Sequence, residues 1–231
     1  MTTDTCELSV IIPVYNDRRV LNSIKCITAV LDNENISYEL IVSGIYCNPR
    51  ELHNVLYIKT NKKGKGYAIK NGVHYSKGKK IIICDADFPV EKNVFVSMIH
   101  EAEHVEAVFG ERIKFIGFSR DRYPIERRIL GYIFRKLVGF IFSTKEVDTQ
   151  CGLKCLYGNT ARRIYSKTQV NGFLTDIEVT ILCRQNGINI KNFPLTWCYV
   201  PKTTVSLIRN IPDTLFDFIK LTKIVINRKC I

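Results

Sequence analysis

The sequence predicts an α/β fold, in which a mostly parallel β-sheet is flanked by helices on both faces. Short apolar segments rich in β-branched residues alternate with segments whose apolar residues recur at helical spacing, as is typical of βαβ units. The composition, with 46% hydrophobic and 24% charged residues, is that of an ordinary globular domain. The length of 231 residues favours a single domain whose core needs no disulfide or metal to be stable.

The first half of the chain shows the alternation clearly. Residues 8–14 form an apolar run followed by polar Tyr15 and Asn16, which predicts a strand buried on both faces and then a loop. Ligands of parallel sheets bind at the carboxyl ends of strands, so we expect this loop and the segment 85–87 to face one crevice. The elements expected after the first strand are a helix over 18–32, strands over 38–42 and 55–58, a glycine-opened helix over 64–77 and a strand over 80–84.

The second half is less regular. Its apolar residues predict a long helix over 122–142. The other expected elements are a short strand pair around 146–157, a helix over 175–186, a strand over 189–199 and a final helix over about 212–228.

The charge balance predicts an anionic partner. Lysine and arginine number 34 against 22 acidic residues, which gives a net charge of +12. Such an excess suits a nucleic acid, a phosphorylated metabolite or a membrane surface. We find neither a signal-peptide pattern nor an apolar run long enough to span a bilayer, which predicts a cytosolic protein. The nine cysteines show no C-x-x-C spacing, so we expect buried free thiols and no zinc site.

Asp85 and Asp87 are candidate metal ligands. They follow a very apolar predicted strand and are separated by one residue. Two adjacent carboxylates repel each other unless a cation lies near them, and Mg²⁺ or Mn²⁺ prefers such hard oxygen ligands. The alternative is a pair of solvated acids in a turn.

Two basic regions are candidate anion or membrane contacts. Residues 59–80 contain eight lysines and no acid, and the glycines at 64 and 66 would let backbone amides approach an anion; the alternative is a solvated basic turn. Residues 112–136 and the final helix are basic, aromatic and amphipathic, which suits an anionic membrane surface. Their apolar faces could instead simply pack on the sheet.

Asp148 and Asp176 are ambiguous from the pattern alone. Asp148 lies in the polar segment 147–154, and Asp176 lies at the predicted start of a helix. Asp148 could brace a turn, and Asp176 could cap the helix.

Together these segments resemble the family 2 inverting glycosyltransferases of GT-A fold, and within that family the dolichyl-phosphate glucose and mannose synthases. Six motifs occur in the family's order, and D-T-Q-C-G is the most specific of them. They are Ser9–Asn16, the N-x-G-K-G-x-A-like segment 61–68, the D-x-D at 85–87, Gly110–Arg112, the D-T-Q-C-G-L-K segment 148–154 and the F-x-x-D-x-E segment 173–178.

The resemblance implies a role for each matched residue. Asp85 would reach the ribose or the metal, Asp87 would hold Mg²⁺ or Mn²⁺, and Asp176 occupies the position of the family's catalytic acid. The nucleotide pocket would be lined by Pro13, Tyr15 and Asn16. The phosphates would face Lys65, Arg112 and Arg120 or Arg122. The acceptor and sugar side would be shaped by Asp148, Gln150 and Lys154.

The resemblance also implies a division of the single domain 1–231. Residues 8–118 would form the nucleotide-sugar-binding half, 119–200 the acceptor half and 201–231 a C-terminal amphipathic helix. One departure is plain, because the family's acidic V-D-D-G-S segment is replaced by Val42, Ser43 and Gly44. Membrane-spanning helices of many relatives are also missing, so the expected lipid contact is peripheral, at the cytosolic face.

The implied reaction moves a hexose from a nucleotide diphosphate sugar to a polyprenyl phosphate with inversion. UDP-glucose is the favoured donor and GDP-mannose the second. A phosphate acceptor is already ionised at neutral pH and needs cations more than a base. Two alternatives stay open: transfer to a hydroxyl, with Asp176 as general base, and a non-catalytic binder of anionic surfaces on the same scaffold. We expect no nucleic acid partner.

Overall fold

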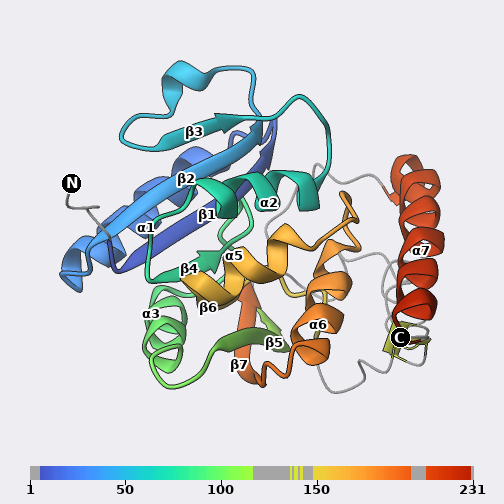
Figure 1. Cartoon of the computed structure of the whole chain (residues 1–231). Coiled ribbons are helices and arrows are strands. Elements are labelled where there is room, and N and C mark those ends of the chain that lie inside the picture. Colours follow the sequence, from blue (N-terminus) through green and yellow to red (C-terminus); the bar gives the residue numbers. More distant parts are fainter. Residues whose placement is uncertain are drawn as a thin grey trace, which may run out of the picture.

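The computed structural model describes residues 6–116, 136, 138–139, 141–142, 148–198 and 207–229. These residues contain a seven-stranded sheet in the order β3-β2-β1-β4-β6-β5-β7 (Figure 1). Its strands are β1 (Leu8–Tyr15), β2 (Tyr38–Ile45), β3 (Leu56–Lys59), β4 (Lys80–Ile83), β5 (Ala107–Ile116), β6 (Lys154–Tyr157) and β7 (Ile190–Cys198).

The strand directions bring distant segments to one edge of the sheet. β1 pairs in parallel with β2 and β4, so the loops that follow β1 and β4 leave at the same edge. β6 runs antiparallel to β4, with Ile83 opposite Lys154, and the segment that leads into β6 therefore arrives at that edge as well. In this way residues 15–19, 85–87 and 148–153 become neighbours.

Helices cover both faces of the sheet (Figure 1). Alternate residues of β1 point to opposite sides: Val10 and Ile12 join the core with α1 (Val20–Asn33) and α3 (Lys92–Glu101), whereas Ile11 joins the core on the other face. The helices of that second face are α2 (Lys65–Tyr75), α5 (Gly158–Ser166) and α6 (Thr175–Gln185). Burial of β1 on both faces confirms the expectation from its uninterrupted apolar run.

The long helix α7 (Leu207–Lys229) lies outside these layers (Figure 1). Its inner residues Leu221 and Val225 join a third apolar cluster with Leu174 and Ile177. Leu174 directly precedes α6, and Ile177 lies in its first turn. The helix therefore packs against α6 and not on the sheet itself.

The predicted fold class is confirmed, and most predicted elements are present. The sequence did not predict α3, β5 or α5; α5 is short and largely polar, and β5 carries charges at Glu111, Arg112 and Lys114. α7 begins at residue 207, five residues earlier than expected. Most of the predicted helix over 122–142 lies outside the described residues, although positions 136, 138, 139 and 141 are helical.

Two expected absences can be compared with the described part of the chain. The seven cysteines whose side chains the structure describes are all free thiols. Within the described ranges, we find no helix that combines the length and the apolar character needed to cross a bilayer.

Candidate functional site

The site lies at the edge where β1 and β4 end. Asp85 and Asp87 follow β4, and the loop between them is tied to α1 because the hydroxyl of Ser23 donates to the carbonyl of Ala86 at 2.7 Å. The backbone amide of Phe88 donates to the carbonyl of Asp85 at 3.0 Å, which closes a tight turn. These bonds hold both carboxylates at the end of the strand, as the sequence predicts.

Each carboxylate of this aspartate pair has a cationic partner. Asp85 Oδ1 lies 3.1 Å from the ammonium of Lys65, and Asp87 Oδ2 lies 3.1 Å from Nη1 of Arg19. Burial, and next the charge of Asp85, raise the pKa of the Asp87 carboxyl above its usual value. The charge of Arg19 lowers this pKa but does not outweigh those two effects.

Lys65 links the aspartate pair to α6. Its ammonium lies 3.1 Å from Asp85 and also 3.1 Å from Asp176 Oδ2, and only 14% of the side chain is exposed. Although burial opposes the charged form, the carboxylates of Asp176 and Asp85 raise the pKa of Lys65. This lysine thus stays charged and joins two segments that are 91 residues apart.

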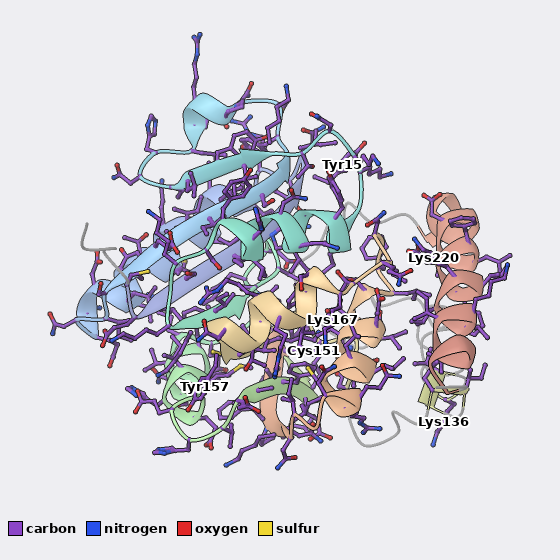
Figure 2. All side chains as sticks on the ribbon, in the orientation of Figure 1. Tyr15, Lys136, Cys151, Tyr157, Lys167 and Lys220 are labelled. Atoms are coloured by element: carbon purple, nitrogen blue, oxygen red, sulfur yellow. The ribbon has the colours of Figure 1, made fainter. Side chains whose placement is uncertain are left out.

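A second buried lysine completes the network. Lys154 is fully buried, and its ammonium lies 2.6 Å from Asp176 Oδ1. It also donates to the carbonyl of Cys151, a buried residue that is labelled in Figure 2. Burial alone would raise the pKa of Asp176, but the charges of Lys154 and Lys65 lower it. Both oxygens of Asp176 are therefore occupied by ammonium groups, which makes it a poor proton acceptor.

The glycines of the 61–68 segment serve packing. The amides of Gly66 and Tyr67 donate to the carbonyls of Gly172 and Asn171, at 3.3 and 3.0 Å. A Cβ on Gly66 would lie 2.6 Å from Cβ of Thr175, closer than such atoms approach. The expectation that these amides face an anion is wrong, because the chain uses them to bring α2 close to α6; the ammonium of Lys65 faces the site in their place.

The D-T-Q-C-G segment forms a wall beside the aspartate pair. Asp148 accepts two hydrogen bonds from the guanidinium of Arg112, at 2.6 and 2.7 Å. Burial opposes this ionisation, but the hydrogen bonds and charge of Arg112 hold the pKa of Asp148 below its usual value. A Cβ on Gly152 would overlap the carboxylate of Asp85, so the glycine leaves the space that this carboxylate fills. Arg112 and Asp148 are thus already paired with each other.

Gln150 lies in the same wall with an unused donor. Its side-chain nitrogen Nε2 is buried and has no hydrogen-bond partner among the described residues. A buried donor without an acceptor costs free energy, which an oxygen of a bound ligand would recover.

Tyr15 and Asn16 end β1 at the same edge. The ring of Tyr15 is 47% exposed, and the ammonium of Lys63 lies 4.8 Å from its centroid, beside the loop that leads into α2 (Figure 2). Asn16 has a φ of 46°, a left-handed conformation that asparagine tolerates. Pro13 pairs with Ser43 inside the sheet.

The missing acid of β2 has a structural basis. Ser43 is fully buried, and Gly44 has a φ of 138°, where a Cβ would overlap the carbonyl of Val14. β2 continues to Ile45, so this stretch is regular strand and leaves no room for an acidic side chain at position 44.

Ion pairs join four of the predicted site residues, Asp85, Lys65, Asp176 and Lys154, into one chain of contacts, and a separate ion pair joins Asp87 to Arg19. Arg120 and Arg122 lie outside the described residues. Arg19, Asp17 and Gly152 were not predicted. The signal for the first two was present, since charged residues directly follow a buried strand whose end faces the site.

The aspartate pair fits Mg²⁺ or Mn²⁺. The two carboxylates supply hard oxygens, their side chains are 29% and 24% exposed, and a cation bound there would offset the charge of Asp85, which after burial is the second cause of the raised pKa of Asp87. The described residues assemble no cluster of three or more histidine, cysteine or acidic ligands. An ion held here would therefore need oxygens from a bound ligand, such as a diphosphate, to complete its coordination.

The chain matches the family named Glycosyl transferase family 2 over residues 46–162. Among curated proteins it is 29% identical over 220 residues to the dolichyl-phosphate beta-glucosyltransferase of Dictyostelium discoideum, with 84% of this chain and 67% of the relative covered. It is 28% identical over 226 residues to the protein of that name from Homo sapiens, with 84% and 68% covered.

Solved structures share the fold. Glucosyl-3-phosphoglycerate synthase from Mycobacterium tuberculosis, in complex with Mn²⁺, UDP and phosphoglyceric acid, superposes with a TM-score of 0.63 at 15% identity, with 86% of this chain and 72% of that chain covered. The same synthase in complex with Mg²⁺ and UDP gives a TM-score of 0.61 at 12% identity, with 86% and 73% covered.

The first prediction concerns the buried network. We expect Asp176→Asn to lower the free energy of unfolding by about 3–5 kcal/mol at neutral pH, because the buried ammonium of Lys154 loses its counter-charge. The lowered pKa of Asp176 means that this contribution is complete above about pH 4 and is lost as the pH falls through the native pKa, so the difference should narrow in acid. Urea denaturation at several pH values measures it.

Glu101→Gln is the matched control for that prediction. It breaks an ion pair between Glu101 and Lys191 that is 26% and 49% exposed, and we expect a change below about 1 kcal/mol. Equal effects of the two substitutions at neutral pH would contradict the role given to the buried network.

The second prediction concerns Gly152. We expect Gly152→Ala to weaken nucleotide-sugar binding by about tenfold or more, because the added methyl group displaces the carboxylate of Asp85. Calorimetric titration measures the binding. Gly187→Ala is the control: nothing lies within 4 Å of its Cβ position, and its φ of 70° makes alanine cost stability without touching the site. Unchanged binding in Gly152→Ala would show that Asp85 needs no such space.

Proposed function

The chain belongs to glycosyl transferase family 2, and from this premise we propose that it transfers a hexose from a nucleotide diphosphate sugar to a polyprenyl phosphate with inversion. The curated relatives named dolichyl-phosphate beta-glucosyltransferase support an acceptor of the dolichyl phosphate class and glucose as the sugar. UDP-glucose is the preferred donor in this proposal, and GDP-mannose is the second.

One observation favours a phosphate acceptor over a hydroxyl. Asp176, the residue at the position of the family's catalytic acid, has both oxygens engaged by Lys65 and Lys154. Asp87 and Asp148 are paired with arginines. The described carboxylates of this edge are therefore ion-paired, and none is poised to deprotonate a hydroxyl. An acceptor phosphate brings its own charge and needs no proton removed.

Asp85 and Asp87 would hold the divalent cation, Mg²⁺ or Mn²⁺. When bound there, the ion would offset the charge of the leaving diphosphate. Use of such ions by this family is supported by the solved neighbours, whose complexes contain Mn²⁺ or Mg²⁺ together with UDP.

The protein's own groups would orient the two anions. Tyr15 presents an exposed ring at the end of β1, where a nucleotide base can stack, and the nearby ammonium of Lys63 suits a phosphate. Gln150 offers its unused donor to a sugar or acceptor oxygen. Lys154 is fully buried, so in this proposal it acts by holding Asp176 and not by touching a ligand.

Peripheral contact with an anionic membrane is the second part of the proposal, and α7 supports it. The helix buries Asp217, Leu221 and Val225 on one side and exposes Leu215, Phe216 and Ile219 on the other; Phe216 is 69% exposed. Lys223 is also exposed among these apolar residues. An apolar face with basic neighbours suits a lipid surface, and we place that surface at the cytosolic face of a membrane.

The third prediction tests the reaction. We expect labelled hexose to pass from UDP-glucose to polyprenyl phosphate in a metal-dependent manner, and Asp87→Asn to lower the rate about 100-fold or more, because the cation loses a ligand. Product formation is followed by extraction into organic solvent. Glu34→Gln, an exposed acid at the end of α1, is the control and should keep the parent rate.

Two outcomes would overturn this assignment. Transfer only to neutral hydroxyl acceptors would favour another reaction of the same family. Binding of anionic surfaces without any donor turnover in the parent protein would favour a non-catalytic binder, whose supporting feature is the absence of an acid at Ser43 and Gly44.

The fourth prediction tests the membrane face. We expect Phe216→Glu to weaken binding to vesicles containing phosphatidylserine by about tenfold or more. The substitution removes apolar area that would be buried in the lipid surface, and it adds a negative charge that the anionic lipid repels. Sedimentation with vesicles measures it. Tyr75→Glu makes a comparable change at a 54% exposed aromatic residue at the end of α2 and should leave binding unchanged. Equal losses in the two variants would show general charge repulsion instead.

A further inference from the structure

Arg19 stands where a cation would be expected beside Asp87. Its Nη1 lies 3.1 Å from Asp87 Oδ2, and its side chain is 24% exposed, the same fraction as that of Asp87. Arg19 lies directly before α1, whereas Asp87 follows β4, so this contact joins two loops of the same sheet edge. The protein itself thus supplies a counter-ion for Asp87, which shares it with Asp17.

Asp17 fixes the direction of this guanidinium. Asp17 accepts hydrogen bonds from Nε at 2.9 Å and from Nη2 at 2.6 Å, and it also accepts the backbone amide of Arg19 at 3.0 Å. The planar guanidinium cannot rotate while these bonds persist, so Nη1 is directed at Asp87. Burial of Asp17, which is 7% exposed, makes the anchor costly to lose.

The neighbouring arginine shows that this arrangement is specific to one position. Arg18 is in the same loop, but its side chain is 69% exposed and pairs with Glu51, away from the aspartate pair. Two adjacent residues with the same charge therefore have different surroundings, and only Arg19 contacts Asp87.

Two neighbouring sets of ion pairs, Asp17–Arg19–Asp87 and Asp85–Lys65–Asp176–Lys154, form one group of charges around the aspartate pair. The cations Arg19, Lys65 and Lys154 face four carboxylates, those of Asp17, Asp85, Asp87 and Asp176, so the group carries one net negative charge. A divalent cation alone would make the group positive by one. A nucleotide diphosphate sugar alone, with about two negative charges on its diphosphate, would make it more negative. The two together return it to its starting charge, so electrostatics favours joint binding over either ligand alone.

We propose that Arg19 is a positioning residue and built-in counter-ion of the aspartate pair, which keeps a divalent cation from binding tightly until a nucleotide diphosphate arrives with it. The inference rests on the proposed function, since it takes Asp85 and Asp87 as the metal ligands. Arg19 acts through Asp87 and carries out no chemical step. A guanidinium also binds phosphate well, so Nη1 can exchange Asp87 for a diphosphate oxygen while Asp17 keeps its hold.

The experiment measures Mn²⁺ binding by electron paramagnetic resonance, with and without saturating UDP. In the parent protein we expect Mn²⁺ to bind weakly alone and at least about tenfold more tightly when UDP is present. By thermodynamic linkage, Mn²⁺ must then raise the affinity for UDP by the same factor. In Arg19→Gln we expect Mn²⁺ alone to bind roughly tenfold tighter than in the parent, because a positive charge near the ion is removed. The factor by which UDP raises the Mn²⁺ affinity should therefore be smaller in Arg19→Gln than in the parent.

Two further variants separate charge from other effects. Arg18→Gln removes one positive charge from the same loop and should leave Mn²⁺ binding within about twofold of the parent, because its pair with Glu51 is exposed and screened. Arg19→Lys keeps the charge and should stay closer to the parent than to Arg19→Gln. Thermal unfolding shows whether Arg19→Gln folds. If it does not, Arg19→Lys provides the test, because Mn²⁺ alone must then bind this variant as weakly as it binds the parent.

The outcomes distinguish this inference from the proposed function. Tight Mn²⁺ binding to the parent without UDP overturns the role of Arg19, as does equal Mn²⁺ affinity of Arg19→Gln and Arg18→Gln. Arg19→Lys behaving like Arg19→Gln also overturns it. If the parent binds no Mn²⁺ even with UDP, the proposed metal site itself fails.

Discussion

The ammonium of Lys65 between Asp85 and Asp176 is the contact on which the site depends. It lies 3.1 Å from each carboxylate and connects the end of β4 with the first turn of α6. Without it, Asp85 would lose its counter-charge and Asp176 would keep only the ammonium of Lys154, in surroundings with little water, which is costly. The tight packing of α2 on the 170–175 segment, made possible by glycines at 64 and 66, is what brings Lys65 into this position.

The pairing of acids with bases gives the site its chemical character. Each described carboxylate at this edge is paired with a lysine or an arginine, so the site is poorly equipped to remove protons; with a divalent cation bound, it would suit two anions. The net charge of +12 likewise favours anionic partners for the molecule as a whole. Both features suit a reaction between a nucleotide diphosphate sugar and an acceptor that is itself a phosphate.

The sequence was most informative where a residue's position along the chain fixes its position in the fold. Asp85 and Asp87 could be predicted because they directly follow a buried strand, and the alternation of strands and helices predicted the sheet. The partners of these residues could not be predicted, since pairs such as Arg19 with Asp87 or Lys65 with Asp176 depend on how distant loops meet. The glycines at 64 and 66 were assigned to an anion for the same reason: only the fold shows that the carbonyls at 171 and 172 accept hydrogen bonds from the amides of Tyr67 and Gly66.

The short segment 169–172 supports three elements at once. Its carbonyls at 171 and 172 receive the first amides of α2, its carbonyl at Gln169 receives the ammonium of Lys220 on α7 (Figure 2), and Gly172 lies directly against Asp217 of α7. Glu178 of α6 binds the amides of residues 169 and 170. The helix end that carries Lys65 and the outer helix α7 therefore rest on the same strip of backbone, so the position of Lys65 depends on a segment that α7 also holds in place.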